Sequence, residues 1–318
     1  MGDNVSEIYV RGKWVKVPSL EFDGMRVVIR GKWLKRAFIS SEEWLDTELK
    51  DPERCISMLR NQGTAGLRAD IFTFSQKLPA MVPKYRYPME WESVAAVRIN
   101  SFKEWWDGLS QVTRKNVRRS QKRGVVVTLR EFDDDLIREL VELNNDVQIR
   151  QGVWNVQYGK SFDQIKKDYS SFLDRSHFIC AHVGNELIGF LKIVHRGEVA
   201  SILNLLPKAS HHDKRPGNAL LAKAVELCES KGVSYLTYGL FNYGNKRESP
   251  LREFKIRNGF SEILVPRFYI PLTRWGRLCF RAKIHRGVIG ILPHRVITLG
   301  VGMRAKWYSL KVRAGVAQ

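Results

Sequence analysis

The stretch His211–Gly232, "HHDKRPGNALLAKAVELCESKG", decides the fold, because it joins a strand-like segment to a long helix. The preceding run "VASILNLL" at 199–206 is apolar and typical of a buried strand. Pro216 and Gly217 stand where a helix begins, and Gly232 stands just past its end. The sequence therefore predicts a strand, a short polar loop and a helix in direct succession.

Two kinds of site fit the loop of this unit. His211, His212 and Asp213 are potential metal ligands, but adjacent loop residues rarely converge on one ion, and no further His or Cys has ligand spacing nearby. The other reading uses the main chain, because the first N–H groups of a helix lack intrahelical partners and can face an anion such as a pyrophosphate. A plain strand–helix connection remains the simplest alternative.

The flanking segments predict an α+β domain with a mixed sheet. From about residue 125 the order is β-α-α-β-β-β-α-β-α-β, and two short turns imply an antiparallel meander in the middle. The expected elements are a strand at 125–129, helices near 133–147 and 162–173, three strands between 177 and 206, the helix before Gly232, the strand "SYLTYG", a helix in "SPLREFKIRNGF" and terminal strands in "EILVPRFYIPL".

Two motifs in this order resemble the GNAT N-acyltransferase superfamily. "KRPGNA" at 214–219 is similar to its pyrophosphate loop Gln/Arg-x-x-Gly-x-Gly/Ala, with Lys in the first place, and "FKIRNGF" at 254–260 is similar to its next signature helix. The resemblance covers about residues 94–272. "LSQVTRKNVRRSQKRG" at 109–124, together with "LREFKIRNGF", resembles the Fem-related acetyltransferase-like branch.

The resemblance implies an acyl donor at the loop and an amine acceptor in a facing cleft. Acyl-coenzyme A is the expected donor, with no metal, and the amine attacks the thioester directly, so Cys180 and Cys228 are given no catalytic role. The residues expected to bind the donor are Lys214, Arg215, Gly217, Asn218 and Ala219. The acceptor is expected to be an amine-bearing small molecule or a cell-envelope precursor.

The catalytic candidates are less clearly marked. Lys255 stands where the superfamily usually has a general-acid tyrosine, and it is a candidate for stabilising negative charge or a lysine on a solvated helix face. His195, Glu198 and the pair His211/His212 are candidate bases, each of which is also explained as a turn or surface residue.

Polar residues elsewhere complete the predicted site. The acceptor cleft is expected to take residues from two loops, and ordinary loop solvation is the alternative for all of them. They are Arg150, Gln151, Tyr158, Tyr238, Asn242 and Tyr243. Residues 114–123 carry six cations and no acid, so Arg114, Arg118 and Arg119 are expected to meet an anion unless this face is simply solvated.

The segments outside 94–272 form two further predicted regions. Residues 1–93 are expected to be a small α+β region, with strands around "VRGKWVK" and "IRGKWLK", a helix capped by Ser41 and a second helix after Pro52. Residues 273–318 are expected to be a basic amphipathic tail. Its apolar stripe is formed by Ile289, Leu292, Val296, Leu299, Met303, Trp307 and Leu310. Packing on the domain core and contact with an anionic inner leaflet are both open for this stripe.

Charge and composition set the remaining limits. The chain of 318 residues has 53 Lys and Arg against 33 Asp and Glu, and this excess of +20 favours an anionic partner. Four scattered cysteines and the lack of a long apolar run predict a reduced, cytoplasmic protein, peripheral to the inner membrane face if the tail binds lipid. Two alternatives to the acyl-coenzyme A enzyme remain: a Fem-like aminoacyltransferase using aminoacyl-tRNA, and a non-catalytic protein that binds nucleic acid or membrane on this scaffold.

Overall fold

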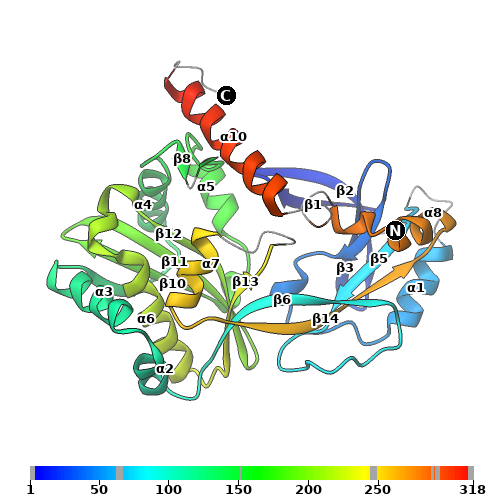
Figure 1. The fold of residues 1–318 in the computed structure, drawn as a ribbon, viewed down its shortest axis with the longest axis horizontal. Coiled ribbons are helices and arrows are strands. Elements are labelled where there is room, and N and C mark those ends of the chain that lie inside the picture. The colour runs from blue at the N-terminus through cyan, green and yellow to red at the C-terminus, as the bar shows by residue number, and fades with distance from the viewer. Residues whose placement is uncertain are drawn as a thin grey trace. The chain divides into compact units, whose positions relative to one another are not determined.

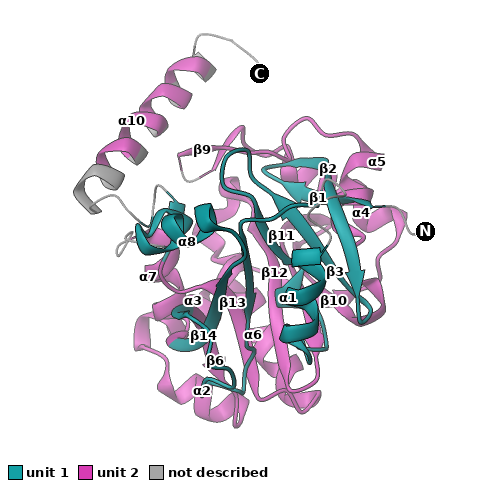
Figure 2. Cartoon of the chain, turned by 90° about the vertical axis from the view of Figure 1, so that its right-hand side faces the viewer, with its two compact units in different colours: residues 1–93, 243–245, 263–292 teal, residues 94–242, 246–262, 293–318 magenta. Residues whose placement is uncertain are grey.

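The computed structural model describes residues 4–61, 67–150, 152–243, 249–287, 290 and 294–313. The chain divides into two compact units, shown in Figure 2: unit 1 is formed by 1–93, 243–245 and 263–292, and unit 2 by 94–242, 246–262 and 293–318. The division therefore differs from the sequence-based one, which split 263–292 between the transferase domain and the tail. The physical reason is strand pairing, because residues 267–271 pair with 71–75 inside unit 1.

Unit 1 consists of one sheet and several short helices, and its residues come from two distant parts of the sequence. Its strand order is β1-β2-β3-β4-β5-β14, and the β4–β5 pair is parallel whereas the other neighbouring pairs are antiparallel. The strands are β1 (Val5–Val10), β2 (Lys13–Phe22), β3 (Met25–Arg30), β4 (Arg36–Ile39), β5 (Ile71–Ser75) and the second half of β14 (Ser261–Pro271). The helices are α1 (Pro52–Asn61), α8 (Arg274–Arg281) and the 3-10 turns η1 (Glu42–Trp44) and η5 (Ile284–Arg286).

The helix expected after Ser41 is absent from the described residues there, and this prediction was wrong. Ser41 has a left-handed backbone (φ 55°) without a side-chain cap, and only the 3-10 turn η1 follows. The cause is a polar contact inside unit 1: the carboxylate of Glu42 accepts a 2.7 Å hydrogen bond from the main chain of Ser75 and lies 3.1 Å from the Arg267 guanidinium. The helix expected after Pro52 is α1.

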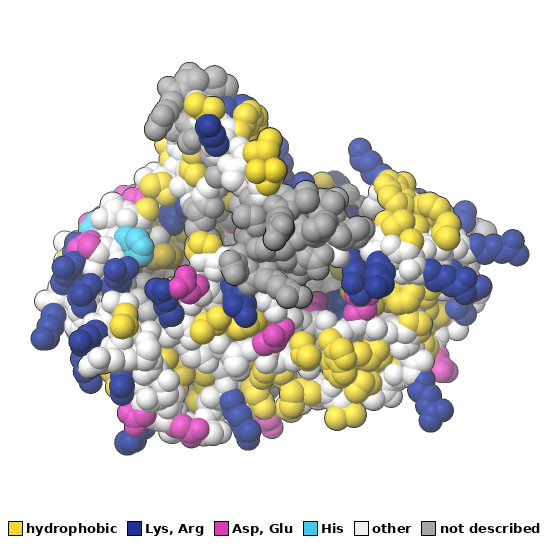
Figure 3. All heavy atoms as spheres, in the orientation of Figure 1, with side chains coloured by type: hydrophobic (Ala, Val, Ile, Leu, Met, Phe, Trp, Pro, Cys, Tyr) yellow, Lys and Arg dark blue, Asp and Glu magenta, His cyan; other side chains and the backbone are white. Residues whose placement is uncertain are grey.

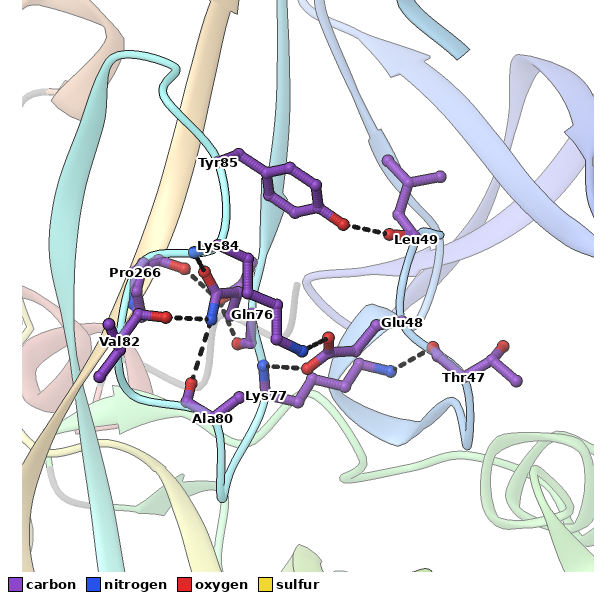
Figure 4. A network of polar contacts seen from close by, with 11 residues as sticks. Thr47, Glu48, Leu49, Gln76, Lys77, Ala80, Val82, Lys84, Tyr85 and Pro266 are labelled. Atoms are coloured by element: carbon purple, nitrogen blue, oxygen red, sulfur yellow. Dashed lines mark hydrogen bonds and ion pairs between the residues drawn. The ribbon is translucent and has the colours of Figure 1, made fainter. Parts of the chain in front are cut away.

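A polar network fixes the loop that follows β5 (Figure 4). The ammonium of Lys77, a buried residue, donates to the main-chain oxygens of Leu45 and Thr47 at 2.7 and 2.8 Å. The side chain of Gln76 donates to the main-chain oxygen of Val82 and accepts from the main chain of Lys84. These contacts are structural, because they satisfy main-chain groups of loops that lack sheet partners.

Unit 2 contains the predicted order of elements up to its last helix, whereas the last predicted strand, β14, lies mostly in unit 1 (Figure 1). The strand order of unit 2 is β6-β13-β12-β11-β10-β7, with β12 and β13 parallel and the other neighbouring pairs antiparallel. The strands are β6 (Met89–Arg98, from residue 94), β7 (Val126–Arg130), β10 (Ser176–Val183), β11 (Glu186–Arg196), β12 (Val199–Pro207) and β13 (Tyr235–Leu240), with a small hairpin of β8 (Ile149–Arg150) and β9 (Val153–Trp154).

The helices of unit 2 cover both faces of its sheet. They are α2 (Phe102–Gly108), α3 (Gln111–Lys122), α4 (Asp134–Asn144), α5 (Phe162–Tyr169), α6 (Pro216–Ser230), α7 (Pro250–Arg257) and α10 (His294–Arg313). Alternate residues of β10 enter two different cores: Ile179 packs with α2, α3 and α6, whereas Cys180 packs with α4 and α5. No helix among the described residues is long and apolar enough to cross a bilayer.

Both units repeat one series of elements, which the sequence did not predict. An antiparallel meander, a helix and a strand parallel to the last meander strand occur as β2-β3-β4-α1-β5 and again as β10-β11-β12-α6-β13. The N-terminal copy was not predictable from the sequence, because α1 begins at "DP" without a glycine loop and β4 has only four residues.

Candidate functional site

The central feature of unit 2 is a parallel strand pair that separates. β12 and β13 pair only from Val199–Ser201 with Tyr235–Thr237, although β12 continues to Pro207. The hydroxyl groups of Ser201 and Thr237 lie 2.7 Å apart at the last pair. Beyond it, β12 has no ladder partner on β13 among the described residues.

Each of the two strands bulges close to the point of separation. On β12, Ile202 and Asn204 lie opposite the adjacent residues Ile193 and Lys192 of β11, so Leu203 is an extra residue. On β13, the register against β6 shifts between Thr237 and Leu240, and Gly239 within this segment has a positive φ of 54°. Bulges re-aim the main chain and are frequent beside active sites, and a glycine adopts this conformation without strain.

The loop after β12 delivers the chain to the start of α6. The 3-10 segment η4 (Ala209–Lys214) is followed by Arg215 in a left-handed conformation, and Pro216 is the first helical residue. The N–H of Asn218 donates to the oxygen of Arg215, and Pro216 has no N–H. Among the contacts of the described residues, the N–H of Gly217 is thus the remaining donor of this turn.

Side chains of this loop divide into cationic and structural ones. Lys214 and Arg215 are half-buried, and the Nε of Arg215 is buried without a recorded partner in the described chain. Asn218 and Ala219 are buried. The Nδ2 of Asn218 donates to Oδ1 of Asn258 at 2.8 Å, so this amide is engaged inside the protein.

Asn258 joins three helices around the loop. Its Nδ2 donates to the oxygen of Phe254 at 2.7 Å, and its own main-chain oxygen accepts from Nε1 of Trp105 at 3.1 Å. A Cβ at Gly259 would lie 2.9 Å from that indole nitrogen, which explains the glycine of "RNGF". The motif therefore holds α2, α6 and α7 together.

Lys255 lies in the interior beside β13. Its side chain is fully buried, and its Nζ donates to the main-chain oxygen of Leu240 at 2.7 Å. The same Nζ lies 4.6 Å from the ring centroid of Tyr238, within the range of a cation–π interaction. The alternative of a solvated lysine is excluded by this burial.

The predicted acceptor residues are scattered. Arg150 donates to the oxygens of Pro207 and Leu143, both at 2.9 Å, and burial lowers its pKa. Asn242 bonds to Glu262 and Arg252, and Tyr158 packs edge-on against Trp154. Tyr243 is exposed and belongs to unit 1. Gln151 lies outside the described residues.

His195 lies near the end of β11 and Glu198 in the turn that follows, so both are beside the start of β12, at the end opposite the loop. The His195 ring packs against His177 with centroids 4.6 Å apart, and chiefly burial lowers its pKa to about 4. Glu198 is exposed in the turn between β11 and β12. The nine residues of β12 span about 26 Å at 3.3 Å per step, so the structure does not bring either side chain to the start of α6.

The three potential metal ligands of the loop have different surroundings. Nε2 of His211 lies 3.3 Å from the carboxylate of Glu186, whereas His212 is exposed. Asp213 accepts a 2.6 Å hydrogen bond from Arg123 at the end of α3. Within the described chain, no group of three His, Cys, Asp or Glu residues is placed to hold a metal ion.

The basic helix α3 packs beside this loop. Arg114 lies 4.0 Å from Asp107, Arg118 lies over the ring of Trp106, and Arg119 is exposed. A cavity of about 440 Å³ between α2, α3 and α6 is lined by Trp106, Arg118 and Lys223, among others. Figure 3 shows dark-blue Lys and Arg side chains over much of the face drawn.

Solved structures resemble this chain at low sequence identity. No family model and no curated protein matches the sequence. Among solved structures, FemX is 10% identical with a TM-score of 0.56, over 83% of this chain and 89% of that chain. The C-terminal domain (DUF2156) of a putative lysylphosphatidylglycerol synthetase from Agrobacterium fabrum is 14% identical with a TM-score of 0.55, over 87% and 91%. L-PGS from Bacillus licheniformis is 12% identical with a TM-score of 0.54, over 86% and 89%.

The chain has a GNAT-like fold. Within this GNAT-like fold, the likeness extends to FemX and to the synthetase domains alike, so it does not single out one branch. At these identities it establishes the fold alone.

Several residues of the candidate site were missed from the sequence. Ser201, Thr237 and Leu203 mark the strand separation, and Asn258 supports the loop. One signal was available, since an isolated glycine inside an apolar strand, such as Gly239, indicates a bulge. The hydroxyl pair left none, because Ser and Thr are common in strands and turns alike.

Proposed function

We propose that unit 2 is an acyltransferase that transfers an acyl group from acyl-coenzyme A to an amine by direct attack on the thioester. One observation carries the proposal: β12 and β13 separate after Ser201, on the strand that leads to the start of α6. A thioester bound along the free edge of β12 would have its carbonyl beside the bulge at Leu203, with its phosphates toward the loop.

The donor's phosphates are assigned to the loop and to the first turn of α6. The helix dipole and the N–H of Gly217 favour an anion there, but Pro216 and Asn218 contribute no free N–H. The cationic side chains of Lys214 and Arg215 therefore supply much of the attraction in this proposal. A Cβ at Gly217 would lie 3.5 Å from the ring of Phe254, so this side of the turn faces α7.

The transition state carries negative charge on the former carbonyl oxygen. Main-chain N–H groups at the β12 bulge are the proposed donors to this oxyanion, since fixed donors in a water-poor site stabilise developing charge. Lys255 is proposed to act at a distance: it holds the bulged end of β13 through Leu240 and adds a buried positive charge.

The proposed reaction uses no covalent enzyme intermediate. Cys180 and Cys228 are buried, and burial raises the pKa of each thiol to about 12, so neither is a thiolate at neutral pH. His195 and Glu198 are not proposed as bases because of their place at the far end of β12. Tyr158 and Tyr238 remain proposed contacts of the acceptor amine.

A second donor is favoured by a specific observation on α3. Four cations of α3 are exposed, and none of them pairs with a carboxylate among the described residues: Lys115, Arg118, Arg119 and Lys122. Such a row suits a polyanion, and aminoacyl-tRNA would supply both this polyanion and an activated acyl group. The acceptor in either case is an amine-bearing small molecule or a cell-envelope precursor.

The two donors are separated by one binding experiment. Thermal unfolding is measured with coenzyme A, acetyl- and longer acyl-coenzyme A, and charged and uncharged bulk tRNA. A ligand at 100 times its Kd stabilises the native state by about 2.7 kcal/mol. Stabilisation by coenzyme A that persists at 0.3 M salt supports the first donor, and salt-sensitive stabilisation by tRNA alone supports the second. Stabilisation by none of them contradicts acyl transfer at this loop.

A further inference from the structure

The outer face of α8 in unit 1 exposes large apolar side chains among arginines. Trp33 is 60% exposed, Trp275 42% and Leu278 57%. The two indole rings lie 5.5 Å apart, and Nε1 of Trp275 donates to the main-chain oxygen of Trp33 at 2.9 Å. We call this surface the tryptophan face; it comprises Trp33, Trp275, Leu278, Arg274, Arg277 and Arg281.

The opposite side of α8 packs into unit 1, and this packing fixes the orientation of the tryptophan face. Gly276 and Cys279 are buried, and a Cβ at Gly276 would lie 1.9 Å from the main-chain oxygen of Asp70. The hydroxyl of Thr273 caps the helix and donates to the carboxylate of Asp70 at 2.8 Å. Arg274, Leu278 and Arg281 follow at steps of four and three, which places them on one outer face.

The charge on this surface is strongly positive. No Asp or Glu occurs between residues 263 and 318, and the three arginines of the tryptophan face pair with no carboxylate among the described residues. Beside the face lies a cavity of about 670 Å³, whose lining includes Arg60, Arg277 and Arg281. Glu53 is the one acid among its lining residues.

We propose that the tryptophan face docks on a bilayer surface rich in anionic phospholipid. Indole rings favour the headgroup level, where one end meets hydrocarbon and the other water. Arginines beside them reach lipid phosphates, and the cavity lined by Arg60 accepts a headgroup phosphate. Exposed Leu278 favours lipid over nucleic acid, because an aliphatic side chain gains from hydrocarbon and contributes little to a phosphate contact. The inference does not depend on the proposed acyl transfer.

The test measures sedimentation of the full chain with vesicles. Phosphatidylglycerol–phosphatidylcholine vesicles are compared with phosphatidylcholine alone, at low and high salt. The variants are Trp33→Ser with Leu278→Ser, and Arg274→Gln with Arg281→Gln, all of exposed residues. Trp91→Ser is the matched control: Trp91 is 51% exposed on β6, and its neighbour Glu90 contacts His285, so Trp91 points to the other side of the strand.

The outcomes decide the proposal. We expect anionic vesicles alone to bind the wild type, about a tenfold loss of partitioning for the apolar double variant and about a fivefold loss for each arginine removed, with Trp91→Ser unchanged. Quenching of wild-type tryptophan fluorescence by brominated lipid, reduced by Trp33→Phe, gives a second readout that does not require the double variants to fold. Unchanged partitioning of both double variants would overturn the proposal. Binding of bulk RNA is measured on the same variants, and a loss confined to RNA binding would also overturn it, because the face would then be an RNA surface.

Discussion

The ammonium of Lys255 donates to the main-chain oxygen of Leu240 at 2.7 Å, directly after the bulged part of β13. A buried cation that binds a main-chain oxygen at this point fixes the strand where it has left its partner β12. Its loss leaves a carbonyl oxygen without this donor and removes a positive charge near the proposed oxyanion. Stability and turnover should respond to the change separately.

Lys255→Met is therefore expected to lower the rate of acyl transfer more than it lowers donor affinity. Charge that develops only in the transition state is not felt in ground-state binding. The free energy of unfolding should fall by about 1–3 kcal/mol from the unsatisfied oxygen. Steady-state kinetics, calorimetric donor binding and urea unfolding measure the three effects.

Lys77→Met is the matched control for this change. Lys77 is also buried, and its Nζ donates to the main-chain oxygens of Leu45 and Thr47 at 2.7 and 2.8 Å. It belongs to unit 1, whereas β12 and β13 belong to unit 2. Both variants should lose stability, but only Lys255→Met should lose turnover; an equal loss of turnover would reduce Lys255 to a packing residue.

Gly217→Glu should abolish donor binding, whereas Gly217→Ala should be tolerated. A Cβ at this position would lie 3.5 Å from the Phe254 ring, an ordinary contact. A carboxylate in the first turn suits the helix dipole but repels phosphate. Gly217→Gln separates size from charge: calorimetry should show weaker loss for Gln than for Glu, and equal losses would mean that bulk alone blocks the loop.

The lowered pKa of His195 predicts that unit 2 loses stability in acid. Its pKa is about 4 in the folded chain against an ordinary 6.5, so between these values the unfolded chain binds a proton that the folded chain does not. The contribution of His195 to the free energy of unfolding should therefore be fully present above pH 6.5. It should fall as pH drops toward 4, by at most about 3 kcal/mol. The pKa of His177 is also lowered, chiefly by burial, which acts in the same direction.

Urea unfolding at pH 7.5 and 4.5 measures this effect. His195→Leu should lose much of the pH dependence, and His212→Leu, which changes an exposed histidine, should keep it. A pH dependence that is identical in wild type and His195→Leu would show that the proton uptake belongs to other groups.

Most elements of unit 2 were predictable because they carry a local signal. Ser101 and Ser110 cap α2 and α3, and Pro216 and Gly232 delimit α6. The site was less predictable, because it depends on where a strand pair ends, and Ser201 and Thr237 are 36 residues apart. The failed helix after Ser41 has the same cause: Glu42 follows distant partners, Ser75 and Arg267, rather than its own segment.

The segment from residue 273, predicted as one tail, has two parts that differ in burial. Leu299, Met303, Trp307 and Leu310 lie 67%, 65%, 49% and 54% exposed along one side of α10, so these four do not pack on the core. Ile289 and Leu292, and the side chain of Val296, lie outside the described residues. By contrast, His285 is buried against Tyr269 and Phe280 in unit 1.

A chain ending at residue 293 should therefore fold, whereas one ending at Thr273 should not. The shorter chain loses Cys279 and His285 from the interior of unit 1, which should cost at least about 3 kcal/mol. The longer one loses only α10, whose exposed stripe and cations such as Arg304 and Lys306 give it a second means of meeting anionic lipid. The chain ending at residue 293 should have the melting temperature of the full chain, whereas the chain ending at Thr273 should not. Sedimentation of the 293 chain with phosphatidylglycerol vesicles should fall about fivefold, because it keeps the tryptophan face but lacks α10. Unchanged sedimentation of that chain would assign all lipid contact to unit 1, and a lowered melting temperature would show that α10 belongs to the core after all.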